Sequence, residues 1–245
     1  MTYCVGICVR NGLVFASDSR TNAGVDSVSE YSKMYSFGVP GERQFTICTA
    51  GNLATTQGVI SQIERDIRNE VQTNLMTVRS VADAASYIGA LSLSQQEKNT
   101  GGGPVFEASF LLGGEVLGAK CRLFMIYSAG NYIESSRQTP YLQVGESKYG
   151  KPILDRVIKT TTNLEEAALC ALVSMESTIR SNLTVGPPVE LQVYQCGSLL
   201  PGQYTSFPVD SRYWRKLKKS WNVEVRNAFG RLPPVDWNEI ESENP

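Results

Sequence analysis

The grouping of strand-like and helix-like segments is the feature that most limits how this 245-residue chain can fold. Strand-like runs occupy 2–10, 13–16, 33–37, 43–50, 105–112, 115–118, 121–127, 132–136, 140–144 and 189–196. Helical spacing of apolar residues, or a proline suited to a first turn, marks about 53–75, about 81–95, a start near Pro152 and about 164–182. Strands and helices each cluster, so strictly alternating βαβ units do not fit. The order predicts an α+β fold, a four-layer αββα sandwich of two antiparallel sheets flanked by helix pairs.

The first two strand-like runs are joined by Asn11-Gly12, which predicts a β-hairpin. A two-residue turn at this point puts Thr2 opposite Thr21 and Asp18 opposite Val5. Residues 19–32 are rich in Ser, Thr, Asn, Gly and Asp and are expected to form a loop.

The sequence predicts one domain over residues 1–200 and a C-terminal extension over 201–245, which packs on the domain or on a neighbouring subunit and has a flexible end. Within the extension, 211–228 has helical character and carries both basic and aromatic residues. Such a segment can bind single-stranded nucleic acid or form a solvated or subunit-contacting helix. The net charge of −1 favours the second interpretation, so no nucleic-acid partner is predicted. The 19% charged residues, below the ~25% of average soluble domains, are consistent with surface buried between subunits.

The chain contains no histidine. This excludes Ser-His-Asp and Cys-His nucleophile systems and histidine-containing zinc or haem sites. Acid–base chemistry must then use a carboxylate, lysine, tyrosine, cysteine or the α-amine of the chain. No cofactor and no metal are predicted.

Compartment signals indicate a cytoplasmic protein. The six cysteines form no CxxC pair and are expected to be free, buried thiols in a reducing compartment; they are Cys4, Cys8, Cys48, Cys121, Cys170 and Cys196. No apolar run reaches the ~18 residues of a membrane span. The first residues lack the basic region and cleavage site of a secretory signal, so no membrane partner is predicted.

Thr2 follows Met1 directly, and a small second residue permits removal of the initiator methionine. The new first residue would carry a hydroxyl nucleophile and a base, its own α-amine, which has an ordinary pKa of ~7.7–8.0. A charged Lys33, held by Asp18, would lower the pKa of both groups. The pairing above puts Asp18 on the other face of the hairpin, so it reaches Lys33 only through a bulge or loop twist. The same two residues also suit an ordinary ion pair.

Several segments resemble the proteasome β-subunits, and most closely the Anbu (ancestral β-subunit) family of proteasome-type proteases. The opening segments are Thr2 with Gly6, Ser17-Asp18-Ser19-Arg20-Thr21-Asn22-Ala23-Gly24 and Lys33-Met34. Thr49-Ala50-Gly51-Asn52-Leu53-Ala54 resembles the turn whose glycine N–H lines an oxyanion hole. The later segments are Tyr141 to Tyr149, with Gly145-Glu146-Ser147-Lys148-Tyr149-Gly150, and Arg180-Ser181-Asn182-Leu183-Thr184-Val185-Gly186-Pro187-Pro188.

The resemblance implies the N-terminal-nucleophile hydrolase fold and self-assembly into a ring or spiral. It implies that Thr2 is the nucleophile and Lys33 the cation that lowers its pKa. Asp18 would orient Lys33, and the Gly51 N–H would stabilise the oxyanion, an interaction that typically contributes ~3–4 kcal/mol.

The chain departs from the general β-subunit pattern at three supporting positions. Gly145-Glu146-Ser147 stands where general β-subunits have Gly-Ser-Gly, Ser181 replaces an aspartate and Thr184 replaces a serine. Ser147 and Ser181 remain the candidates for the supporting groups.

Four functions follow from these observations. The first is a threonine-type peptidase that forms an acyl-enzyme on Thr2 inside a self-assembled oligomer. The second is another amide or acyl-transfer reaction on the same fold, and the third is a scaffold subunit with weak or no catalysis. The fourth is nucleic-acid binding through 212–221. The sequence indicates neither the substrate nor whether an ATP-driven unfoldase is a partner.

Overall fold

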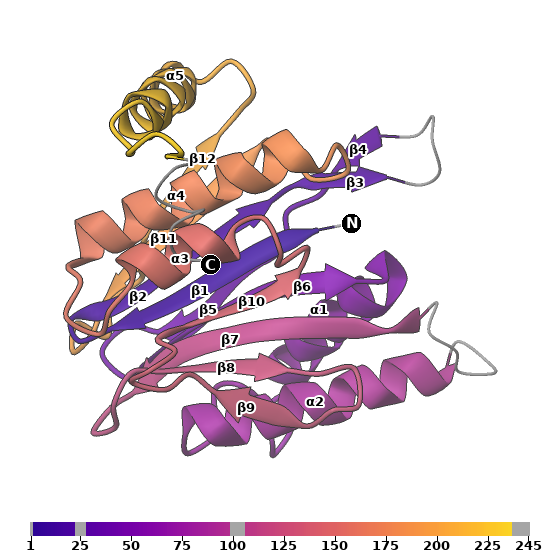
Figure 1. Ribbon diagram of the computed structural model, residues 1–245. Coiled ribbons are helices and arrows are strands. Elements are labelled where there is room, and N and C mark those ends of the chain that lie inside the picture. Colours follow the sequence, from indigo (N-terminus) through magenta and orange to yellow (C-terminus); the bar gives the residue numbers. More distant parts are fainter. Residues whose placement is uncertain (1, 23–27, 99–105, 237–245) are drawn as a thin grey trace, which may run out of the picture. The chain divides into compact units, whose positions relative to one another are not determined.

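The computed structural model describes residues 2–22, 28–98 and 106–236 (Figure 1). The chain divides into two compact units, Met1–Val209 and Asp210–Pro245. The first unit extends past the boundary predicted at residue 200 because β12 (Gln203–Phe207) pairs with β11 (Val189–Gln195). The predicted flexible end, beyond residue 236, lies outside the described residues.

Two five-stranded antiparallel sheets form the centre of the first unit. The first sheet has the order β10-β1-β2-β11-β12 and the second has the order β5-β6-β7-β8-β9. The remaining strands of the first sheet are β1 (Tyr3–Val9), β2 (Gly12–Asp18) and β10 (Tyr141–Gly145). Those of the second are β5 (Met34–Val39), β6 (Arg43–Gly51), β7 (Ala108–Val116), β8 (Arg122–Ile126) and β9 (Tyr132–Glu134).

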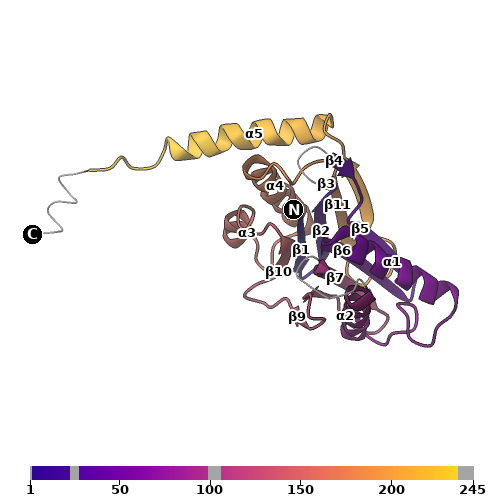
Figure 2. The ribbon, with the colours of Figure 1, turned by 90° about the vertical axis from the view of Figure 1, so that its right-hand side faces the viewer.

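A helix pair covers the outer face of each sheet, as both ribbon views show (Figures 1 and 2). The pair on the second sheet is α1 (Leu53–Arg68) and α2 (Val81–Lys98), and the pair on the first is α3 (Lys151–Val157) and α4 (Leu164–Ser181). Asn52 and Asn163 cap α1 and α4, since each side chain accepts a hydrogen bond from the first-turn backbone. The predicted αββα sandwich is confirmed.

One cluster of the hydrophobic core lies between the sheets and another between the second sheet and its helices. Buried residues such as Val14 and Leu172 also pack between the first sheet and its helices. Leu13, Phe15, Met34, Leu111 and Leu123 lie in the layer between the sheets. This packing holds the two sheets together while leaving the start of β1 at one edge of the sandwich, where the candidate site lies.

The register of the first hairpin differs from the prediction. Cys4 pairs with Ser17 and Val9 with Gly12, so the turn is Arg10-Asn11 rather than Asn11-Gly12. Asp18 is thereby brought two positions nearer the start of β1, and its Oδ1 accepts a hydrogen bond from the Tyr3 N–H at 3.0 Å. Pairing of β2 with β11 is continuous as far as Asp18, so the bulge considered in the sequence analysis is absent from β2.

Several element boundaries also differ. The predicted loop 19–32 contains the two-stranded sheet of β3 (Arg20–Asn22) and β4 (Val28–Glu30). Gly113-Gly114 does not break β7: a Cβ on Gly113 would lie 2.5 Å from Phe15 Cζ, so this glycine permits close approach of the sheets. The first helix ends at Arg68, whereas Leu75 joins the core from the segment that follows.

The expectation of six free cysteines is wrong, because Cys121 and Cys196 form a disulfide. Both lie at strand ends, one before β8 and one after β11, and the bond links the two sheets. No local pattern indicates this pairing, since 75 residues separate the partners. The other four cysteines are free thiols.

The second unit contains α5 (Arg212–Phe229), close to the predicted segment 211–228. Ser211 caps it by accepting a hydrogen bond from Trp214 N. Among the described residues, none of the helices combines the length and apolar character needed to cross a membrane.

Candidate active site

Thr2 lies immediately before β1, half-buried, and β10 fixes its backbone. The Thr2 carbonyl accepts a hydrogen bond from the Glu146 N–H at 2.7 Å. Gly145 makes this approach possible: its φ is +83°, and a Cβ there would lie 1.9 Å from the Thr2 carbonyl oxygen. The start of the chain is therefore seated against the end of β10.

Lys33 and Asp18 form a buried ion pair beneath this point. The distance from Lys33 Nζ to Asp18 Oδ1 is 2.7 Å, and the side chains are 6% and 0% exposed. The ammonium group also donates to the Arg20 carbonyl at 2.6 Å. An ammonium group has three hydrogens, so one is left without an acceptor in the described part of the chain.

Asp18 is held by backbone donors as well as by Lys33. Its Oδ1 accepts from Tyr3 N, and its Oδ2 accepts from Gly186 N at 3.1 Å. Burial raises the pKa of the Asp18 carboxyl, whereas the positive charge of Lys33 and these hydrogen bonds act to lower it. The carboxylate thus fixes the lysine to the residue that follows Thr2.

A cavity of about 270 Å³ joins the site residues. Thr2, Lys33 and Gly51 all line it, although they come from the start of β1, the segment before β5 and the end of β6. Gly51 has a φ of +108°, and a Cβ would lie 2.3 Å from the Glu107 carbonyl oxygen. It directly precedes the cap of α1, so the positive end of that helix dipole adds to the field at the cavity.

Glu190 on β11 is a buried carboxylate that no sequence motif singles out. It is 3% exposed and accepts from the hydroxyls of Ser17, Ser19 and Ser32, at 3.1, 3.2 and 2.8 Å. It also accepts from the Lys33 N–H at 3.3 Å and from the Tyr204 hydroxyl at 2.7 Å. One side chain therefore ties the strand that carries Asp18 to the segment that carries Lys33.

The side chains of the two predicted supporting serines take no part in the hydrogen bonds named above. Ser181 is exposed at the end of α4, and Ser147 is half-buried with its carbonyl accepting from Gln143 Nε2 at 3.4 Å. Glu146, whose backbone N–H binds the Thr2 carbonyl, forms a side-chain network with Asn182 and Thr184.

In this network Glu146 Oε2 accepts from Asn182 Nδ2 at 3.1 Å. Asn182 Oδ1 in turn accepts from the Thr184 hydroxyl at 2.6 Å. The departure of Glu146 from the family pattern is the sequence signal for this network. The strand pattern alone does not indicate that Glu190 faces inward.

The fold and this cavity define a class of protein. It is a four-layer αββα sandwich of the proteasome type, in which a threonine before the first strand shares a cavity with a lysine and a glycine from two other segments. The family model described as "Proteasome subunit" matches residues 2–193. The chain belongs to the proteasome subunit family, and within it to the Anbu (ancestral β-subunit) group.

Solved structures support this placement. Anbu from Yersinia bercovieri is 44% identical, with a TM-score of 0.92, over 96% of this chain and 99% of that one. The helical assembly of the Anbu complex from Pseudomonas aeruginosa is 42% identical, with a TM-score of 0.92 and the same coverage. An Anbu mutant (Gly-1) from Hyphomicrobium sp. strain MC1 is 40% identical, with a TM-score of 0.90, over 96% and 100%. A search of curated proteins gave no match.

Proposed function

We propose that this protein is a threonine-type amide hydrolase that cleaves peptide bonds with Thr2, after removal of Met1, in the cytoplasm. The observation that carries the proposal is the shared cavity of Thr2, Lys33 and Gly51, with Lys33 fixed by Asp18. In a chain without histidine, this is an arrangement in which a hydroxyl can be activated.

The reaction begins when the freed α-amine of Thr2 accepts the proton of the Thr2 hydroxyl, through a water molecule. The hydroxyl oxygen attacks the substrate carbonyl, and the free hydrogen of the Lys33 ammonium favours the deprotonated oxygen. The Gly51 N–H stabilises the negative charge that develops on the carbonyl oxygen. Collapse expels the amine product, which takes the proton from the α-amine, and leaves an ester on Thr2. Water then hydrolyses the ester by the same groups.

A second candidate, an amide or acyl-transfer reaction on a different substrate, is favoured by the network beside Thr2. Glu146 and Asn182 form that network. A different polar environment for the α-amine suits a different leaving group or acceptor.

Self-assembly is part of the proposal, and it is supported by the helical assembly formed by the Pseudomonas aeruginosa relative. In the extension 201–245, α5 exposes apolar side chains that suit a subunit contact; they are Tyr213, Val223, Val225 and Phe229. Light scattering of the full chain and of a chain ending at Val209 tests this role, because loss of the extension should reduce the oligomer size. A scaffold function without catalysis remains the alternative.

Catalysis is tested by intact mass and by labelling with a β-lactone or epoxyketone probe. The proposal expects loss of Met1 and one adduct on Thr2, absent from Thr2→Ala. Processed protein without an adduct, under conditions where the probe is intact, contradicts it. An adduct without turnover of a peptide library selects the second candidate.

A further inference from the structure

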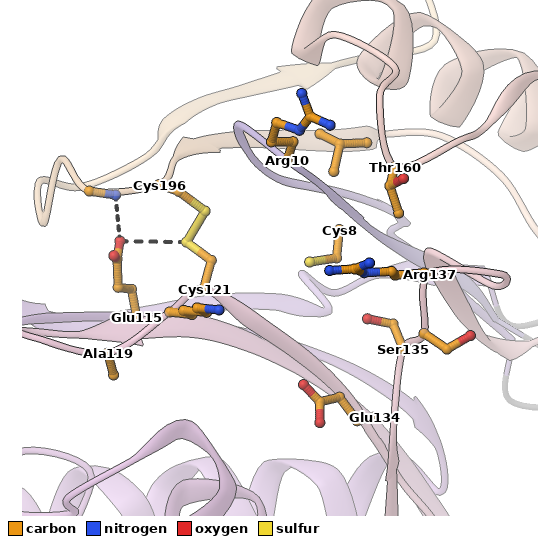
Figure 3. Close-up of a pocket in the computed structure, with 14 residues that line it drawn as sticks. Cys8, Arg10, Glu115, Ala119, Cys121, Glu134, Ser135, Arg137, Thr160 and Cys196 are labelled. Carbon is orange, nitrogen blue, oxygen red and sulfur yellow. Dashed lines mark hydrogen bonds between the residues drawn. A yellow bond between two sulfur atoms is a disulfide. The ribbon is translucent and has the colours of Figure 1, made fainter.

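A second large cavity lies at the other end of β1 from Thr2. Its volume is about 690 Å³, within the usual range for small-ligand sites. Cys8 lies near the last residue of β1, six residues after Thr2, and so about 20 Å away along the strand. Figure 3 shows the cavity between the end of β1, the segment before β8 and the segment after β11.

Three sulfur atoms line this cavity. Two belong to the disulfide Cys121–Cys196, which links the second sheet to the first. The third is the free thiol of Cys8 (Figure 3). All three residues are only partly buried, so a molecule in the cavity could approach the disulfide.

The charges around the cavity favour an anion. Arg10, Lys120 and Arg137 line it, are exposed, and have no ion-pair partner in the described residues. The two carboxylates of the lining are already engaged. Glu115 accepts from the Tyr194 hydroxyl at 2.7 Å and from Gly197 N at 2.8 Å, and Glu134 accepts from Arg122 at 2.8 Å.

We propose that this cavity binds a small thiol bearing carboxylates and that the bound thiol reduces the Cys121–Cys196 disulfide. The three cations would hold the carboxylates, and the partly buried disulfide lies in the same cavity. The inference does not depend on catalysis by Thr2.

In the exchange, the thiolate of the ligand attacks Cys121. A new bond forms between the ligand sulfur and Cys121 Sγ, the Cys121–Cys196 bond breaks, and its electron pair leaves on Cys196 Sγ, which takes a proton from water. Glu115 Oε2 lies 3.5 Å from Cys121 Sγ, so negative charge is less favourable there than on Cys196. A second ligand thiolate attacks the ligand sulfur of the mixed disulfide and releases the oxidised ligand. Cys121 leaves as a thiolate, takes a proton from water, and then donates a hydrogen bond to Glu115.

Cys8 is not the attacking group in this scheme. Burial raises the pKa of its thiol, which keeps it protonated and weakly nucleophilic at neutral pH.

The test compares glutathione with its diethyl ester at equal thiolate concentration, on the full chain purified without reductant. Alkylation followed by peptide mass spectrometry measures the reduction of Cys121 and Cys196. Glutathione should react roughly ten-fold faster at low ionic strength, and added salt should shrink the difference. The triple variant Arg10→Gln, Lys120→Gln, Arg137→Gln should remove it.

The matched control neutralises three exposed cations on α1 and α2, Arg65→Gln, Arg68→Gln and Lys98→Gln, and should keep the preference. Circular dichroism checks that both variants are folded. Equal rates for the two thiols in the wild type, or Cys121 and Cys196 already fully alkylated in the untreated protein, would overturn the proposal.

Discussion

Lys33 and Tyr3 donate to the same oxygen of Asp18: the distances to Oδ1 are 2.7 Å from Lys33 Nζ and 3.0 Å from Tyr3 N. The cation and the backbone of the residue after Thr2 are thus held by one atom. A shift of the ion pair would move both the proposed nucleophile and the group that tunes it. This relation makes the ion pair the first target for a mutational test.

Lys33→Ala should abolish most reactivity at Thr2, by about 100-fold or more in probe labelling. It also leaves a buried carboxylate with two N–H donors and no cation, so the free energy of unfolding should fall by about 3–5 kcal/mol. The control is Lys151→Ala, which removes an exposed ion pair with Asp155 (55% and 49% exposed) and should cost less than about 1 kcal/mol. Urea unfolding and labelling rates measure both. Undiminished labelling in a folded Lys33→Ala protein would refute the proposed role.

Gly51→Ala should lower both stability and reactivity. The new Cβ would meet the Glu107 carbonyl oxygen at 2.3 Å, and the φ of +108° is unfavourable for alanine. Gly41→Ala is the matched control, because Gly41 has a φ of +82° and a Cβ added there would meet no non-neighbouring atom within 4 Å. Gly41→Ala should lower the free energy of unfolding by about 1–2 kcal/mol through the backbone conformation alone. Gly51→Ala should lower it by more.

The labelling rate separates the two glycines further. Displacement of the Gly51 N–H would weaken the proposed oxyanion contact, so labelling of Thr2 should fall in Gly51→Ala at a temperature where the protein is fully folded. It should be unchanged in Gly41→Ala. Equal labelling rates in both variants would remove Gly51 from the proposed oxyanion site.

Much of the fold can be predicted because hydrophobic periodicity and capping residues are local. The helix pairs and most strands follow from such patterns, for example the apolar stripe of α4. The hairpin register cannot be predicted in this way. Asn11-Gly12 is a favourable turn pair, but the observed turn at Arg10-Asn11 is fixed by pairing with β10 and β11. The disulfide depends on the packing of two sheets and has no local signal.

The candidate site shows the same division. Thr2, Lys33 and Gly51 follow from resemblance and chemistry, and the fold brings them to one cavity. The role of Glu190 could not be predicted from the sequence, because a glutamate in an alternating strand is expected on the solvent face. Only the contacts across the sheets make it an inward residue with five donors.

Glu190→Gln should disturb the site through position rather than through contact with substrate. An amide offers one acceptor oxygen where five donors converge, and its NH₂ group opposes some of them. The free energy of unfolding should fall by about 2–4 kcal/mol. Labelling of Thr2 should slow, since both the Asp18 strand and the Lys33 segment lose an anchor.

Tyr204→Phe is the matched control for Glu190, since it removes one of the five donors and keeps the carboxylate. This variant should lower the free energy of unfolding by about 1 kcal/mol and leave the rate of Thr2 labelling close to that of the wild type. If Glu190→Gln is destabilised but labels at the wild-type rate, the residue has only a structural role.

Tyr3 gives a test at alkaline pH. Burial raises its pKa above the ordinary value of 10.0, and its hydroxyl lies 3.1 Å from Ser174 Oγ and 2.7 Å from Gln143 Nε2. Above pH 10 the unfolded chain loses this proton while the folded protein keeps it, so stability is present below pH 10 and is lost as the pH rises. The expected loss from this group is about 1.4 kcal/mol per pH unit.

Tyr3→Phe should make the slope of unfolding free energy between pH 10.5 and 12 shallower by about that amount. Tyr149→Phe, at a residue that is 41% exposed, is the control and should keep the wild-type slope. Because Tyr3 adjoins Thr2, a slope unchanged in Tyr3→Phe would mean that water reaches the start of β1, contrary to the seating of Thr2 described above.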